Sequence, residues 1–171
     1  MISYQPAFDP FHAIFRVARL GSIIERCRAP EADKVRILDF YMCFPFRAVD
    51  IKFQRGDGRF KKVARSYDNL RPYGGLPDDA DLIARMMPAQ RLALETLAFR
   101  GSLDPDALRQ GRVVLGDVPL PAELLSRVSA TNDDQTDLME LLETLCLDYP
   151  LLGVQGLKQR TGLLEHRYDA I

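Results

Sequence analysis

The sequence predicts a mainly α-helical protein with one small β-hairpin or wing (α+β), folded as a single compact domain over residues 1–171. Apolar residues recur at helical spacing through most of the chain, and Pro and Gly separate short segments. Residues 47–71 instead alternate between polar and apolar. We divide the domain into an N-terminal helical pair (1–46), a basic hairpin or loop (47–77) and a helical remainder (78–171) with a C-terminal tail.

The first helix of the N-terminal pair begins at Asp9-Pro10. Asp9 suits the N-cap and Pro10 suits the first helical position. Gly21 weakens the helix by about 1 kcal/mol relative to Ala, but the two isoleucines that follow indicate that it continues. One apolar stripe at i, i+3, i+4 and i+7 is formed by Phe11, Ile14, Phe15 and Ala18.

The second helix runs from Pro30 to about Phe44, where Pro45 stops it. Its sequence, KVRILDFYMCF, is apolar around most of the helix circumference, which predicts burial. We expect Leu38 and Tyr41 in the core. The sequence does not decide whether Phe44 and Phe46 lie in the core or at a partner interface, where they would be candidate anchors.

The basic segment turns at the glycines 56 and 58, which predict a hairpin or loop. Between residues 47 and 71, eight Lys or Arg residues face three Asp residues. Phe53, Phe60 and Tyr67 are interleaved with them and suit stacking on exposed bases. A solvated hairpin with an ordinary charge excess is the alternative. The candidate DNA-contacting residues are Arg55, Arg59, Lys61, Lys62 and Arg65.

The pattern in the remainder of the chain predicts mostly short helices. Two helices flank Pro88, a short helix opens at Asp104-Pro105, and residues 111–116 predict a short strand. A helix over 121–130 precedes an amphipathic helix over 132–150 with Leu138, Leu141, Leu142 and Leu145 on one face. The order of elements between Ala89 and Ala130 is compatible with a winged-helix-like unit. A plain helical bundle is the alternative.

No chemistry stands out along the chain. There is no P-loop motif, and RGDGRF lacks the third glycine and helix entry of a dinucleotide site. The two histidines, His12 and His166, lie at opposite ends of the sequence, so they offer no paired base or metal site. The acidic run from Asp133 to Glu143 reads as a helix N-terminus and its solvated face. We therefore predict no catalytic, cofactor-binding or metal-binding residue and no enzyme.

The composition limits partners and location. A net charge of −1 argues against a surface built wholly for nucleic acid. No run of 18 apolar residues is present, and the N-terminus lacks the pattern of a secretory leader. Three scattered cysteines fit a reducing compartment. We expect a cytoplasmic protein that does not contact membranes.

Three stretches resemble one known family. YQPAFDPFHAIFRVARL near the start, RILDFYMCFPF in the middle and GLKQRTGLLEHRYD near the end are similar to the small middle component of bacterial ABC-three-component systems. These are antiphage defence operons related to Lamassu-type systems. The resemblance implies a non-catalytic accessory subunit that bridges or regulates an SMC/Rad50-like ABC ATPase and its effector, often a nuclease. It also makes a basic segment that faces DNA less surprising.

Two other functions remain open at the level of sequence. One is a freestanding winged-helix DNA-binding regulator, although Arg127 is the only basic residue in the helix that would be its recognition helix. The other is a metal-dependent nuclease or hydrolase that uses the carboxylates between Asp133 and Glu143.

Overall fold

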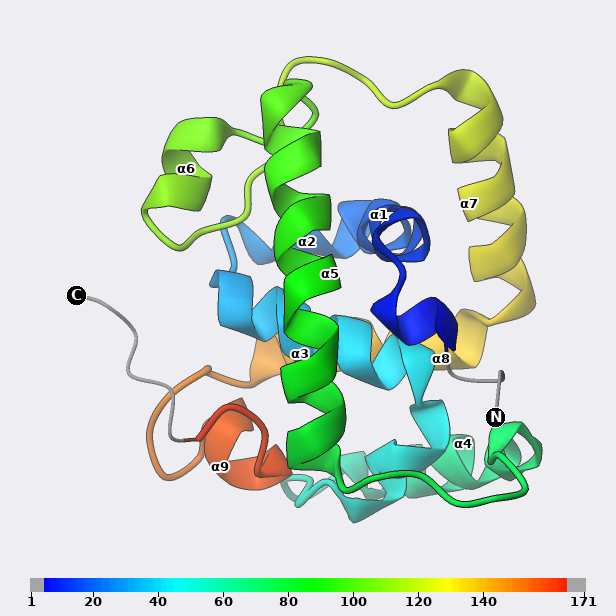
Figure 1. The fold of residues 1–171 in the computed structure, drawn as a ribbon. Coiled ribbons are helices and arrows are strands. Elements are labelled where there is room, and N and C mark those ends of the chain that lie inside the picture. The colour runs from blue at the N-terminus through cyan, green and yellow to red at the C-terminus, as the bar shows by residue number, and fades with distance from the viewer. Residues whose placement is uncertain (1–4, 166–171) are drawn as a thin grey trace.

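The computed structural model describes residues 5–165, which form nine α-helices and four 3-10 helices (Figure 1). The 3-10 helices are η1 (Gln5–Phe8), η2 (Pro45–Asp50), η3 (Asp57–Arg59) and η4 (Asp68–Leu70). The α-helices are α1 (Pro10–Arg19), α2 (Gly21–Cys27), α3 (Ala32–Cys43), α4 (Phe60–Ser66), α5 (Asp79–Phe99), α6 (Pro105–Arg109), α7 (Ala122–Asp134), α8 (Thr136–Asp148) and α9 (Leu157–Thr161).

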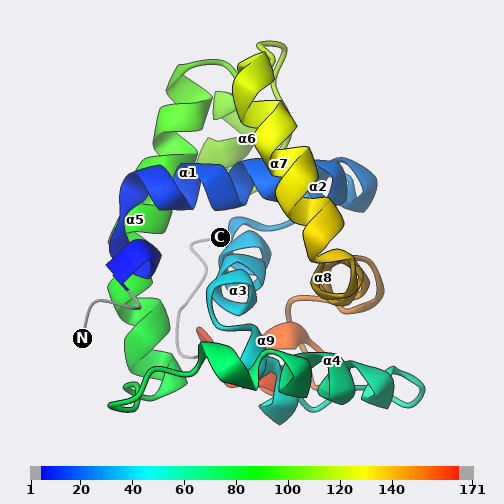
Figure 2. The same ribbon diagram turned by 90° about the vertical axis from the view of Figure 1, so that its right-hand side faces the viewer.

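Helix α3 is the centre of the fold. It packs against α1, α5, α8 and η2. Figure 2 shows α1 and α2 above it, α4 below it, and α5 and α8 on its two sides. Leu38 and Tyr41 are buried as expected, and the helix ends before Pro45. The prediction of a nearly all-round buried helix is confirmed.

Helix starts follow the local signals in the sequence. Asp9 Oδ1 accepts hydrogen bonds from the backbone N–H groups of Phe11 (2.7 Å) and His12 (3.2 Å). Asp78 and Asp104 cap α5 and α6 in the same way. Each carboxylate satisfies donors that have no partner within the helix, so these starts are fixed by two or three residues.

The two helices expected on either side of Pro88 are one continuous helix, α5. Pro88 is exposed, so the carbonyl that its missing N–H leaves unpaired lies on the solvent side. Ala89 and Ala93 on the adjoining face pack against Ala13 of α1. Close packing on one face and water on the other therefore keep the helix unbroken through the proline.

The basic segment 47–77 is helical, and the predicted hairpin is wrong. It contains η2, η3, α4 and η4. Phe60, Val63, Ala64 and Tyr67 fall at i, i+3, i+4 and i+7 and turn toward the core. Alternation is confined to a few residues before the two glycines, and the helical spacing after them is too short to stand out, which explains the error.

The wing is not present either. Within residues 5–165, β structure consists of two isolated antiparallel bridges, Glu31 with Arg112 and Leu103 with Leu115. The segment predicted as a strand runs closely along the end of α5, and a Cβ added at Gly116 would lie 2.1 Å from the carbonyl oxygen of Gly101. The winged-helix-like unit is therefore replaced by a loop packed against α5.

The predicted helix over 132–150 is divided. Helix α7 continues to Asp134, Gln135 adopts a non-helical conformation, and α8 begins at Thr136. The apolar face of α8 is confirmed, because its four leucines are completely buried. Within residues 5–165, none of the helices combines the length and the apolar character needed to cross a bilayer.

Candidate nucleic-acid interface

The five basic residues predicted to contact DNA lie together on the short stretch from residue 55 to residue 65, at the bottom of the molecule in Figure 2. Phe60 and Ala64 of α4 point into the core. On the opposite side of α4, Lys62 and Arg65 are exposed and Lys61 is half-buried. Arg55 and Arg59 are exposed in the turn just before the helix. The structure therefore does gather these side chains, on a helix rather than on a hairpin.

Helix α8 and the residue after it hold this segment in place. The Tyr149 hydroxyl donates to Asp57 Oδ2 (2.8 Å) and accepts from the backbone N–H of Gln54 (3.0 Å). The Tyr67 hydroxyl donates to Asp137 Oδ1 (2.7 Å). Burial, and then the Asp57 carboxylate, raise the pKa of Tyr149 to about 12, so the hydroxyl keeps its proton at neutral pH.

Arg59 is already committed to the protein itself. Its guanidinium forms an ion pair with Glu140 (2.8 Å) and stacks over the ring of Phe60 at 4.5 Å. No hydrogen bond or ion pair within residues 5–165 engages the charged groups of Arg55, Lys61, Lys62 and Arg65. We call these four residues the basic face. Four cations are therefore free to meet an anion, rather than five.

The placement of the lysines does not serve helix stability. Lys61 and Lys62 stand in the first turn of α4, where the positive end of the helix dipole disfavours cations by roughly 0.3–1 kcal/mol each. The expected base stacking by aromatic residues is not available at Phe60, which is buried against Phe53 with ring centroids 5.9 Å apart. The basic face can contact phosphates, whereas Phe60 cannot reach bases.

The predicted partner anchors Phe44 and Phe46 are both buried by their own chain. Their rings pack against each other with centroids 6.3 Å apart, and the Arg71 guanidinium covers the Phe46 ring at 4.7 Å. In this structure they are core residues around Pro45. An interface needs side chains that are accessible before binding, so we place no partner contact on them.

The acidic residues between 133 and 143 do not converge. Asp133 and Asp134 are the last residues of α7, so the expectation that they complement a helix N-terminus is wrong. Asp137 and Glu140 are tied to α4, and Glu143 forms an ion pair with Arg26. Within the described part of the chain, no group of three or more His, Cys, Asp or Glu residues is arranged to hold a metal ion.

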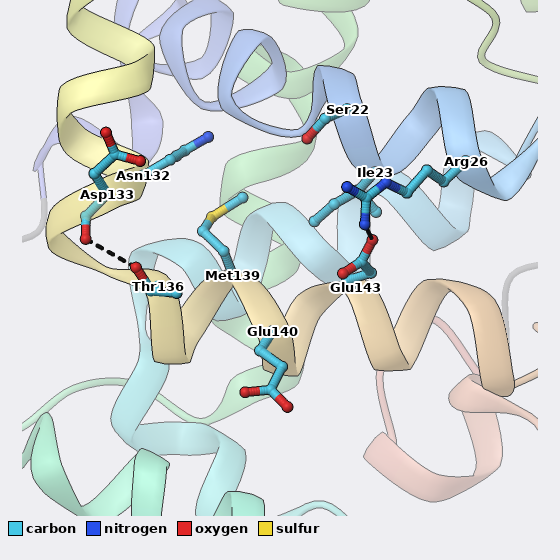
Figure 3. A pocket seen from close by; sticks show the side chains of 9 residues that line it. All are labelled: Ser22, Ile23, Arg26, Asn132, Asp133, Thr136, Met139, Glu140 and Glu143. Carbon is cyan, nitrogen blue, oxygen red and sulfur yellow. Dashed lines mark hydrogen bonds and ion pairs between the residues drawn. The ribbon is translucent and has the colours of Figure 1, made fainter.

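A hollow of about 400 Å³ lies between α2, the end of α7 and α8 (Figure 3). Glu140 points away from the Arg26–Glu143 pair, and the Thr136 hydroxyl donates to the backbone oxygen of Asp133 (2.9 Å). The polar groups around the hollow are thus either dispersed or paired with each other. The hollow is lined by Ser22, Ile23, Arg26, Asn132, Asp133, Thr136, Met139, Glu140 and Glu143.

The cysteines and histidines, the candidate nucleophiles and general bases, also form no catalytic group within the described residues. His12 is exposed on α1, and His166 lies outside the described residues. Burial raises the pKa of the Cys43 thiol to about 12 and also raises the pKa of Cys146. Thiols with such pKa values carry little thiolate at neutral pH.

Sequence reasoning missed the contacts that position the basic face. Tyr149 lies 92 residues from Asp57, and Tyr67 lies 70 residues from Asp137. No local pattern links residues so far apart. The one available signal is that a lone tyrosine follows directly after the apolar stripe of α8, at the point where such a side chain can be buried with its hydroxyl bonded.

Comparison with known families decides the assignment. The family model described as ABC-three component (ABC-3C) system Middle Component 5 matches residues 2–169. The chain belongs to this family. The resemblance seen in the sequence is confirmed over nearly the whole chain, and membership implies an accessory role in a multi-subunit defence system with partner proteins. No curated protein and no solved structure matches the chain.

Proposed function

We propose that this Middle Component 5 protein is a non-catalytic accessory subunit of an antiphage defence complex, in which it bridges or regulates an SMC/Rad50-like ABC ATPase and its effector. The observation that carries the proposal is the family match over residues 2–169. The dispersed carboxylates of the described residues and the raised pKa values of Cys43 and Cys146 support it, because ATPase and effector chemistry then belongs to other subunits. We place this complex in the cytoplasm, where foreign DNA would be met.

Association with the products of the neighbouring genes tests the proposal. We expect the chain to co-purify with the ABC ATPase encoded beside it when both are produced together. Separate circular-dichroism melts of both proteins provide the control for folding. Two folded proteins that elute apart at micromolar concentrations would contradict the proposal.

The non-catalytic part has its own test. The isolated chain should cleave neither single-stranded nor double-stranded DNA in the presence of Mg²⁺ or Mn²⁺. Metal-dependent cleavage that disappears in Asp134→Ala or Asp137→Ala would show that this part is wrong and would favour a nuclease that uses the acidic run.

We propose that the basic face adds a sequence-independent contact to the DNA backbone within this complex. Four free cations on one exposed segment support it, and the lack of accessible stacking at Phe60 favours phosphates over bases. If all four neutralise phosphates, the logarithm of the affinity for duplex DNA should fall with the logarithm of the salt concentration with a slope of about −3 to −4.

Neutralising the basic face provides the matched test. Replacing Arg55, Lys61, Lys62 and Arg65 by Gln should lower DNA affinity at low salt by at least tenfold and flatten the slope. Replacing four exposed arginines elsewhere, Arg85, Arg91, Arg100 and Arg109, removes the same charge and should change affinity much less. Equal losses in the two variants would show that net charge, and not this face, governs binding.

A further inference from the structure

Helix α1 leaves the first residue of its apolar stripe in solvent and buries both of its arginines. Phe11 is 81% exposed, and Phe15 is half-buried. Arg16 and Arg19 of the same helix are each only 6% exposed. An ordinary surface helix turns its charges to water and its large apolar side chains to the core, so an exposed phenylalanine beside two buried arginines is unusual.

Specific polar contacts fix α1 in this orientation. The Arg16 guanidinium donates to both oxygens of Asp39 (Nε–Oδ1 2.6 Å and Nη2–Oδ2 3.2 Å) and to the carbonyl of Pro6 (2.9 Å). Gln90 donates to the same carboxylate at 2.8 Å. Burial alone would lower the pKa of Arg16, but the Asp39 carboxylate outweighs it and the net shift is upward. The guanidinium therefore stays charged.

Arg19 extends the same arrangement to α7. It donates to Asn132 Oδ1 (2.8 Å) and to Gln135 Oε1 (2.7 Å), while the Asn132 amide donates back to the carbonyl of Arg19 (3.1 Å). Turning α1 to bury Phe11 would break these bonds and leave two cations without partners, which costs several kcal/mol. The exposure of Phe11 is thus built into the fold.

Two neighbouring helices frame this stripe. Helix α1 packs against both α5 and α7, and both extend beyond α1 on the side away from α3 (Figures 1 and 2). Each carries exposed apolar side chains, and that of Phe99 at the end of α5 is 93% exposed. We call this set the α1 face, and its members are Phe11, Phe15, Leu92, Phe99 and Leu125.

One free cation stands at the α1 face. The guanidinium of Arg127, on α7, lies over the Phe15 ring at 5.4 Å. Within residues 5–165, no carboxylate pairs with it, although Glu123 stands one turn earlier on the same helix. After Asp9, α1 itself contains no acidic residue. A molecule that covers this face would therefore gain most from apolar groups placed beside one carboxylate.

We propose that the α1 face docks an amphipathic helix of another subunit of the complex, with apolar residues at i, i+3 or i+4 and i+7 and an acidic residue that pairs with Arg127. Phe11 and Phe15 are one helical turn apart, about 6 Å along the axis, which matches the spacing of apolar residues on successive turns of such a helix. The inference rests on the proposed function, because it takes the occupant from the partner subunits that family membership implies.

A double substitution tests the α1 face in the co-produced complex. Phe11→Ser with Phe99→Ser removes two exposed aromatic groups without touching the buried contacts of Arg16. We expect the dissociation constant for the subunit that binds this chain to rise at least tenfold. Leu152→Ser with Val154→Ser is the matched control, because both side chains are exposed in the loop between α8 and α9. The control should change the constant less than twofold, and both variants should melt near the wild type.

Charge reversal tests the acidic partner residue. Arg127→Glu should weaken binding at least fivefold, whereas Arg109→Glu, on exposed α6, should leave it within twofold. If the wild type binds a subunit and the α1-face variants bind it equally well, the α1 face is not the docking surface, although the proposed function stands. If the wild type binds no subunit, both fail. A concentration-dependent dimer of the isolated chain that these substitutions abolish would assign the face to a second copy instead.

Discussion

Helices α1 and α8 carry equally regular apolar stripes in the sequence, but the fold buries the α8 stripe completely and the α1 stripe only in part. The leucine stripe of α8 is completely buried, whereas the stripe of α1 begins with a phenylalanine that is mostly in water. The difference lies in the charged residues of each helix. Helix α8 carries acids that bond to Tyr67 and Arg59 at the two ends of α4, and α1 carries arginines that bond to Asp39, Asn132 and Gln135 inside the protein. Amphipathic spacing therefore predicts a helix but not which side is buried.

The largest effect should come from breaking the contact that orients α1. Asp39→Ala leaves the Arg16 cation buried without its carboxylate, and we expect a loss of about 3–5 kcal/mol in the free energy of unfolding. Urea denaturation measures it. Arg26→Ala, which breaks the exposed ion pair with Glu143, is the control and should cost less than about 1 kcal/mol. Similar losses in both variants would mean that the buried pair does not hold α1.

The next largest difference in the free energy of unfolding should come from truncating one side chain in each stripe. Leu142→Ala on α8 creates a cavity in the core and should cost about 2–5 kcal/mol. Phe11→Ala on α1 removes a side chain that is largely in water and should change stability by about 0.5 kcal/mol or less. The two midpoints in one urea series test the contrast directly, and a Phe11→Ala variant as unstable as Leu142→Ala would show that the stripe is covered in solution.

A smaller and pH-dependent effect is expected where α8 holds α4. Because the pKa of Tyr149 is raised from 10.0 to about 12, its contribution is complete below pH 10 and is lost as the pH rises toward 12. Tyr149→Phe removes the hydroxyl and should cost about 1 kcal/mol at pH 7. Between pH 10 and 12 the melting temperature of the wild type should approach that of the variant. A difference that stays constant over this range would rule out a role for ionisation of this group.

The features that the sequence predicts correctly are those decided by neighbouring residues. The cap at Asp9, the stop before Pro45 and the buried leucines of α8 each depend on a few positions in one helix. The hairpin predicted for the basic segment is wrong, because a short alternating run before the glycines outweighed the four residues at helical spacing after them. The excess of basic residues is visible in composition alone, and their contact with DNA stays a prediction.

The features that the sequence does not predict depend on partners far along the chain. Arg16 contacts Asp39 and Gln90 only after α3 and α5 are in place, so the sequence around Arg16 does not predict that it is buried. Asp57 is fixed by Tyr149 in the same way. Phe44 and Phe46 fit a core or an interface equally well by composition, and only the fold shows that the chain covers them.

Hydroxyl-radical footprinting of the isolated chain and of its complex with the neighbouring subunits compares α1 and α8 most directly. In the isolated chain, Phe11 and Phe99 should react rapidly, and the buried leucines of α8 should be protected. In the complex, we expect the reactivity of Phe11 and Phe99 to fall at least fivefold, while Val154 and the α8 leucines stay unchanged. A complex that forms while Phe11 and Phe99 remain as reactive as in the isolated chain would contradict the role we assign to the α1 face.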